Sequence, residues 1–197
     1  TQWIKQGGKY TKHWAFVPPV ITPPKSAPNA TGSDAIDAYI KDKLKENRSS
    51  LNKAADKTTI ARRVSLVLTG LPPELNVLEA YLADSSDTAY ETLVDTLLAS
   101  PRYGEHQARF WLDAVRYGDT HGLHLDNRRG IYPYRDWVIG AMNDNLPLDT
   151  FIRWQLAGDL LPNSTLEQKV ATGFVRMNPS TAEGGAIPAE FQAKNNF

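Results

Sequence analysis

The stretch from residue 116 to residue 130 concentrates side chains that can do chemistry. It reads RYGDTHGLHLDNRRG and holds two histidines, two aspartates, three arginines and three glycines. It lies between two segments whose hydrophobic periodicity predicts helices, so it is either a binding site or a solvated connection. Aspartate oxygens bind calcium and histidine nitrogens bind zinc, which makes metal binding the first chemistry to weigh.

Two sets of residues in and around this stretch have metal-binding side chains. His121 and His124 could supply nitrogen ligands for zinc, but a glycine separates them and no H-E-x-x-H pattern is present. Two solvated loop histidines are therefore the alternative for this pair. Asp113, Asp119 and Glu183 could supply oxygen ligands for calcium. Binding of calcium or of zinc is thus an alternative to a site that binds no metal.

The helix expected before this stretch has one face of polar side chains, which continues into the stretch itself. At about 100° per residue, one face gathers His106, Arg109, Asp113, Arg116 and Tyr117. This polar stripe is either a solvated face held by ion pairs of Asp113 with Arg109 and Arg116, or the border of a cleft. An aspartate between two arginines stays ionised, which suits ion pairing or ligand binding better than acid catalysis.

The segment YRDW places Arg135 beside Asp136 at the expected start of the next helix. Asp136 suits the positive end of the helix dipole. Arg135 is expected to bond Asp113 and so tie two helices together, or to bind an anionic ligand. Further along, Glu183 precedes two glycines in a loop where backbone can approach a ligand closely. These residues join Arg116, Tyr117 and Asp119 as the predicted ligand-binding set.

Three tryptophans leave a carbohydrate polymer open as a ligand or substrate: Trp111, Trp137 and Trp154. Aromatic rings can stack on sugar rings, and paired carboxylates can do acid–base work on glycosidic bonds. Exposed tryptophans beside a cleft would favour this alternative, and tryptophans in the core would weaken it.

The composition excludes several classes of protein. The 197 residues are 41% hydrophobic and 22% charged, which is typical of a globular domain with a real core. Basic and acidic residues number 22 each, so no basic excess indicates nucleic acid, and no apolar stretch is long enough to span a membrane. The lack of cysteine excludes disulfides, thiolate metal sites and covalent haem c within this chain.

The hydrophobic pattern predicts an all-α fold, an irregular bundle of about eight short helices with long functional loops. The helices are expected to begin near residues 33, 57, 74, 87, 100, 134, 150 and 165. A capping box of Ser164 and Glu167 is expected at the last of them. A proline-rich linker precedes the bundle, because five prolines between residues 16 and 32 forbid a helix there.

Several long strings together resemble a known family. RRVSLVLTGLPP, LLASPRYGEHQARFWLDAVRYGD, YPYRDWVIGAMNDNLPLDTFIRWQLAGDLLP and ATGFVRMNPSTAEGG are similar to the planctomycete cytochrome-associated domain of unknown function. WIKQGGKYTKHWAFVPP resembles the junction that follows the cytochrome domain in those proteins. The resemblance implies a cytochrome c-like tail over residues 1–17, a linker over 18–33 and the helical domain over 34–197. We expect that domain to be truncated at its C-terminus and the chain to be part of a longer polypeptide.

The resemblance also implies a context. The parent protein would be exported, in the periplasm, with haem c in the cytochrome domains that are this chain's expected partners. The family's pattern includes counterparts of Asp113, Arg116, Tyr117, Asp119, Arg135, Asp136, Asp159 and Glu183. His121 and His124 are not part of that pattern, which favours the carboxylates over the histidines.

Three functions follow from these observations as hypotheses. The first is a helical accessory module that positions redox domains and binds a ligand at a polar cluster of aspartate, arginine and glutamate. The second is an enzyme or binding module for a carbohydrate polymer, and the third is a calcium- or zinc-binding domain.

Overall fold

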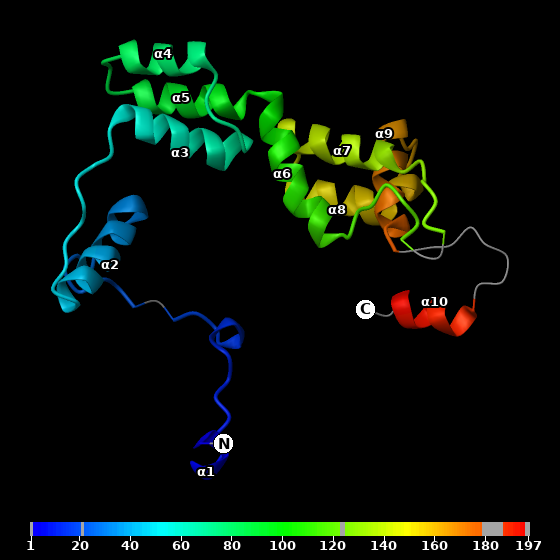
Figure 1. The fold of residues 1–197 in the computed structure, drawn as a ribbon, viewed down its shortest axis with the longest axis horizontal. Coiled ribbons are helices and arrows are strands. Elements are labelled where there is room, and N and C mark those ends of the chain that lie inside the picture. Colours follow the sequence, from blue (N-terminus) through cyan, green and yellow to red (C-terminus); the bar gives the residue numbers. More distant parts are fainter. Residues whose placement is uncertain (1, 21, 123–124, 179–186, 196–197) are drawn as a thin grey trace. The chain divides into compact units, whose positions relative to one another are not determined.

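The computed structural model describes residues 2–20, 22–122, 125–178 and 187–195 (Figure 1). Its α-helices are α1 (Gln2–Lys5), α2 (Gly32–Glu46), α3 (Lys57–Thr69), α4 (Leu75–Ala83), α5 (Ala89–Leu98), α6 (Pro101–Ala114), α7 (Tyr132–Asn143), α8 (Leu148–Ala157), α9 (Leu166–Ala171) and α10 (Pro188–Asn195). Short 3-10 helices are η1 (Trp14–Phe16), η2 (Gly158–Leu160) and η3 (Thr172–Arg176). These described ranges hold no β-strand, and the prediction of an all-α fold with about eight short helices is confirmed. None of the described helices is long and apolar enough to cross a membrane.

The chain divides into two compact units, residues 1–54 and residues 55–197. In the first unit, the proline-rich segment is tied to α2 by polar contacts. The backbone N–H of Ser26 donates to the carboxylate of Asp42 at 3.1 Å, and Lys25 pairs with Glu46 at 3.1 Å. The hydroxyl of Tyr39 donates to a carbonyl of the same segment. The segment therefore lies along the helix that it precedes.

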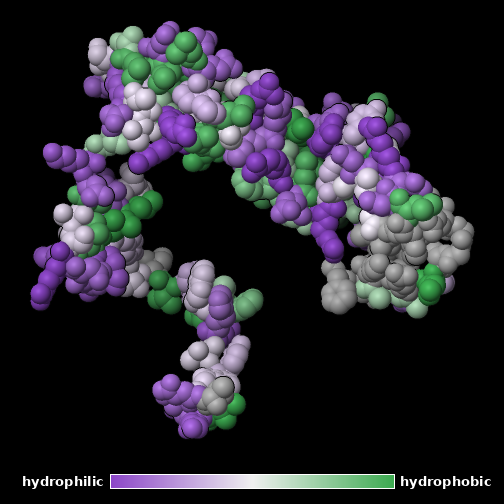
Figure 2. Space-filling view, viewed as in Figure 1, coloured by the Kyte–Doolittle hydropathy of each residue, from purple (hydrophilic) through white to green (hydrophobic). Residues whose placement is uncertain are grey.

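In the second unit, α3, α4 and α5 pack side by side around a small apolar core (Figure 1). The core residues are Ala61, Tyr81, Ala89, Leu93 and Leu97. Helix α3 begins where the carboxylate of Asp56 accepts a hydrogen bond from the backbone of Thr59 at 2.8 Å, and it ends at Gly70. Apolar side chains also lie on the outer surface over α4 (Figure 2), where Leu75 is exposed.

Helices α6, α7 and α8 form the main core together with α9 and η3. Its buried residues are Ala108, Tyr134, Val138, Ala141, Phe151 and Met177. A polar network crosses this core: Trp111 donates through Nε1 to Tyr134 and to Gln155, each at 3.0 Å, and the Tyr134 hydroxyl donates to Gln155 at 2.6 Å. Because buried polar atoms are costly without partners, this network sets the register of α6, α7 and α8.

Helix α6 connects the two cores, because it contacts α3, α5 and α7. Its approach to α7 requires a glycine. A Cβ atom at Gly104 would lie 2.5 Å from the side chain of Asn143 and from the carbonyl of Ile139. Instead, the Gly104 N–H donates to Asn143 Oδ1 at 2.7 Å. The helices α6 and α7 therefore cross with their backbones in close contact.

Helix α6 ends in a Schellman motif that leads into the predicted site. The N–H of Arg116 donates to the carbonyl of Asp113 at 3.0 Å, and the N–H of Tyr117 donates to that of Leu112 at 2.8 Å. Arg116 has a φ of 59°, in the left-handed region where glycine is usual. Asn145 ends α7 in the same way with a φ of 48°.

The connection from α6 to α7 folds back on itself as a short hairpin. Thr120 and Arg128 form an isolated antiparallel bridge, and the N–H of Arg129 donates to the carbonyl of Asp119 at 2.9 Å. The base of the hairpin thus places Asp119 opposite Arg129, directly before α7.

The capping box predicted for α9 is wrong by one residue. Thr165, not Ser164, accepts from the N–H of Gln168 at 3.2 Å, and the Gln168 side chain accepts from the N–H of Thr165 at 2.9 Å. The spacing was correct, but the neighbouring threonine has the extended backbone that the cap requires.

Candidate ligand-binding site

Four of the predicted site residues come together where the hairpin meets the start of α7. The hydroxyl of Tyr117 donates to Asp119 Oδ1 at 2.7 Å. Arg135 donates from Nε and Nη2 to Asp136 Oδ1, at 2.9 Å and 2.8 Å. We term Tyr117, Asp119, Arg135 and Asp136 the polar cluster.

The two pairs of the polar cluster act on each other electrostatically. Burial, followed by the hydrogen bond and charge of Asp119, raises the pKa of Tyr117 to about 12. The charge of Arg135 opposes that increase, and the charge of Asp136 adds to it. The hydrogen bond to Asp136 and the charge of Asp136 raise the pKa of Arg135, and the charge of Asp119 adds to that increase. At neutral pH the cluster therefore combines a protonated phenol, a guanidinium and two carboxyl groups.

This combination is suited to binding a polar ligand. The phenol and the guanidinium donate hydrogen bonds, and the carboxyl oxygens accept them. Arg135 and Asp136 are only partly buried or exposed, so a ligand can reach them from solvent.

Two predicted residues at the C-terminal end of α6 lie outside the cluster. Asp113 and Arg116 are exposed, and within the described residues Asp113 forms no ion pair with Arg109 or Arg116. The prediction that Arg135 ties α6 to α7 through Asp113 is wrong, because the guanidinium bonds the neighbouring carboxylate of its own helix. The polar stripe of α6 is thus largely a solvated face.

Two further predicted residues, Glu183 and His124, lie outside the described residues. His121 lies in the hairpin, where its N–H donates to the carbonyl of Asn127 at 2.9 Å. Across the described part of the chain, no three His, Asp or Glu side chains gather closely enough to hold a metal ion. Calcium and zinc stay predictions, because both proposed ligand sets include a residue that is not described.

Arg129 is a structural arginine of this region that the sequence pattern did not indicate. Its guanidinium donates to three successive carbonyls, those of Arg176, Met177 and Asn178, each at 3.1 Å, and its Nε donates to Gly118 at 3.4 Å. Burial lowers the pKa of Arg129. It therefore fastens the end of η3 to the hairpin that carries Asp119.

A groove of about 640 Å³ opens beside the polar cluster and shares Asp136 with it. Helices α7, α8 and α9, which lie together in Figure 1, form its walls. Asp144 and Glu167 add two more carboxylates, and neither was predicted. The sequence contains one indication of this groove: Tyr132, Asp136 and Gly140 of α7, and Asp144 directly after it, recur every four residues.

The three tryptophans divide between the core and the groove. Trp111 is held in the core by its hydrogen bonds to Tyr134 and Gln155. Trp137 stacks on Phe151 with ring centroids 5.1 Å apart, yet it also lines the groove. Trp154 lines the groove from α8. The structure thus places two of the three beside a cavity and one in the core.

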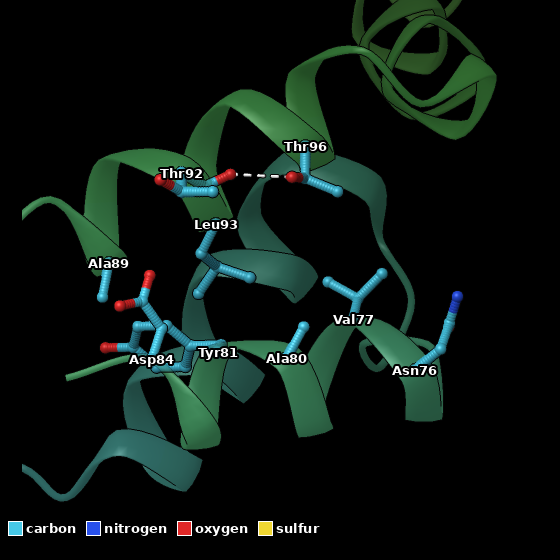
Figure 3. Close-up of a pocket in the computed structure, with 9 residues that line it drawn as sticks. All are labelled: Asn76, Val77, Ala80, Tyr81, Asp84, Ala89, Thr92, Leu93 and Thr96. Atoms are coloured by element: carbon cyan, nitrogen blue, oxygen red, sulfur yellow. Dashed lines mark hydrogen bonds between the residues drawn. The ribbon is translucent and has the colours of Figure 1, made fainter. Parts of the chain in front are cut away.

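A second, smaller hollow lies between α4 and α5 (Figure 3) and has a volume of about 250 Å³. Tyr81 and Leu93 line it. The Nζ atom of Lys57 lies over the Tyr81 ring, 5.1 Å from the ring centroid, and donates to the carbonyls of Tyr81 and Asp84. Tyr81 and Leu93 belong to the apolar core of α3, α4 and α5, so this hollow is a feature of packing.

Comparison with known proteins gives one match. No curated protein and no solved structure matches the chain. The model of the family described as PSCyt2, a protein of unknown function (DUF1549), matches residues 35–197, which is most of the chain. The family's name points to a cytochrome context, and its description assigns no activity. Because the family's model matches residues 35–197, this chain belongs to the DUF1549 family.

Proposed function

We propose that this chain is a helical accessory module of a larger exported c-type cytochrome protein, and that it binds a ligand at the polar cluster. The binding part rests on one observation: Tyr117 and Asp119 of the hairpin lie near enough to Arg135 and Asp136 of α7 to act on them electrostatically. The cytochrome part is supported by the family's name and by the sequence resemblance. In such a protein other domains would hold haem c, since this chain has no cysteine to attach it.

A carbohydrate ligand is the second candidate. It is favoured by Trp137 and Trp154, which line the groove next to the carboxylate of Asp136.

The binding proposal is tested by a melting-temperature screen of the whole chain against organic anions and neutral oligosaccharides. A true ligand at a hundredfold excess over its Kd should stabilise the fold by about 2.7 kcal/mol. That stabilisation should fall in Arg135→Gln and persist in Arg153→Gln, whose arginine is exposed on α8 and bonds Thr150. Equal stabilisation of both variants, or none with any compound, would contradict binding at the polar cluster.

The cytochrome context needs a separate measurement. The natural polypeptide that contains this domain, purified from its source, should show the absorption bands of haem c. A spectrum without them would remove the cytochrome part of the proposal and leave the binding part intact.

A further inference from the structure

The walls of the groove beside the polar cluster are acidic and apolar. Among its described lining residues, Asp136, Asp144 and Glu167 are charged, and no lysine, arginine or histidine occurs. The remaining lining residues are aromatic, aliphatic, glycine or proline. Since the whole chain has equal numbers of acidic and basic residues, this concentration of negative charge is local.

Two of these three carboxylates have no cation of their own. Asp136 shares its charge with Arg135 at 2.8 Å. Within the part of the chain that the structure describes, Asp144 and Glu167 form no ion pair. They come from different elements, the end of α7 and the first turn of α9, and both are exposed. The groove thus presents two separate negative charges to an occupant.

Aromatic rings line the same groove as these charges. Tyr132 is 53% exposed at the start of α7, and Trp154 lines the groove from α8. The faces of aromatic rings attract cations, and their carbon surface packs on methylene groups. Carboxylates with aromatic rings therefore suit a ligand that alternates ammonium groups with short aliphatic chains.

We propose that the groove binds an aliphatic polyamine, with ammonium groups at Asp144 and Glu167 and the methylene chain along the aromatic wall. The volume of about 640 Å³ lies within the range of roughly 300–1,000 Å³ typical of small-molecule sites. A neutral sugar fits less well, because its hydroxyls need donors as well as acceptors and the charged groups of the groove only accept. The inference goes beyond the proposed binding at the polar cluster, because its ammonium contacts are Asp144 and Glu167 of the groove, and it does not depend on a cytochrome parent.

The test is calorimetric titration of the whole chain with spermidine, with hexane-1,6-diol and a neutral trisaccharide as uncharged controls. Spermidine should bind with one saturable site, and rising salt should weaken it, because the attraction is electrostatic. The double variant Asp144→Asn with Glu167→Gln should bind at least about tenfold more weakly. Tyr132→Leu should weaken binding by a smaller factor, since it removes a ring face but keeps apolar surface.

The matched control is Asp149→Asn, which removes an exposed carboxylate from the first turn of α8, outside the groove lining. It should bind spermidine as the unaltered chain does, and the melting temperature of each free variant shows that it is folded. Equal weakening in Asp149→Asn and the double variant would overturn the groove as the site, as would the lack of saturable binding. Binding of the trisaccharide but not of spermidine would also overturn the inference, while leaving the proposed ligand-binding function standing.

Discussion

At the residue scale, the surroundings of Tyr117 keep its phenol protonated within the polar cluster. Its hydroxyl donates to Asp119 at 2.7 Å, and ionising the phenol would place two negative groups within that distance. Tyr134 in the core also has its pKa raised to about 12, chiefly by burial, against an ordinary value of 10.0. Both phenols are therefore protonated across the physiological range, one as a surface donor and one as a core donor.

Tyr117 and Tyr134 should consequently lose their phenol protons at a higher pH than ordinary tyrosines. Their folded-state pKa values lie above the unfolded value, so their stabilising effect is complete below pH 10 and is lost as pH rises from about 10 to about 12. Tyrosinate absorbance against pH should show two tyrosines that ionise late, near pH 12, in the folded chain but not in urea. Tyr117→Phe should remove one of the two and leave the other. Loss of both, or of neither, would show that Tyr117 does not have the environment described.

At the element scale, the crossing of α6 and α7 positions the site, because the hairpin connects these two helices. The crossing depends on Gly104, whose N–H bonds Asn143 and whose missing Cβ admits the backbone of α7. The hairpin is held in turn by Arg129, which bonds carbonyls at the end of η3. Packing at a distance from the polar cluster thus fixes the cluster's geometry.

Two glycine variants of these helices should change stability in opposite directions. Gly104→Ala forces atoms together at the crossing and should lower the free energy of unfolding by about 1–3 kcal/mol. Gly140→Ala, in α7, meets open space and should raise it by about 0.5–1 kcal/mol, because alanine favours a helix more than glycine does. Urea denaturation of both variants measures the difference. A Gly104→Ala chain as stable as the parent would show that the helices cross less closely than the structure indicates.

At the scale of the whole molecule, the polar cluster, the groove and both apolar cores belong to the second unit, residues 55–197. The family model begins earlier, at residue 35, and so includes α2 of the first unit. The family's domain and the compact folding unit therefore have different N-terminal boundaries.

The second unit should fold without the first. A chain of residues 55–197 should keep a cooperative thermal transition, shifted by no more than about 2–4 °C, which corresponds to about 1 kcal/mol in a domain of this size. Circular dichroism with heating of the long and short chains makes the comparison. A short chain without a cooperative transition would show that the first unit is needed for folding.

Local patterns in the sequence predict most of the helices and the members of the polar cluster. Ser100 and Asp56 accept hydrogen bonds at the starts of α6 and α3, as their positions predict, because capping acts over two or three residues. Tyr117 and Asp119, and likewise Arg135 and Asp136, are near neighbours in sequence, so their pairings are also local.

The tertiary structure alone decided how those pairs meet and what surrounds them. Arg129 finds its acceptors 47 to 49 residues along the chain. Glu167 faces the groove with Asp144 only because α9 packs on α7 and α8. Short-range hydrogen bonds and hydrophobic period are encoded within a few residues, whereas contacts between distant segments depend on how whole helices pack. The polar cluster was therefore foreseeable from its residue types, and the acidic aromatic groove beside it was not.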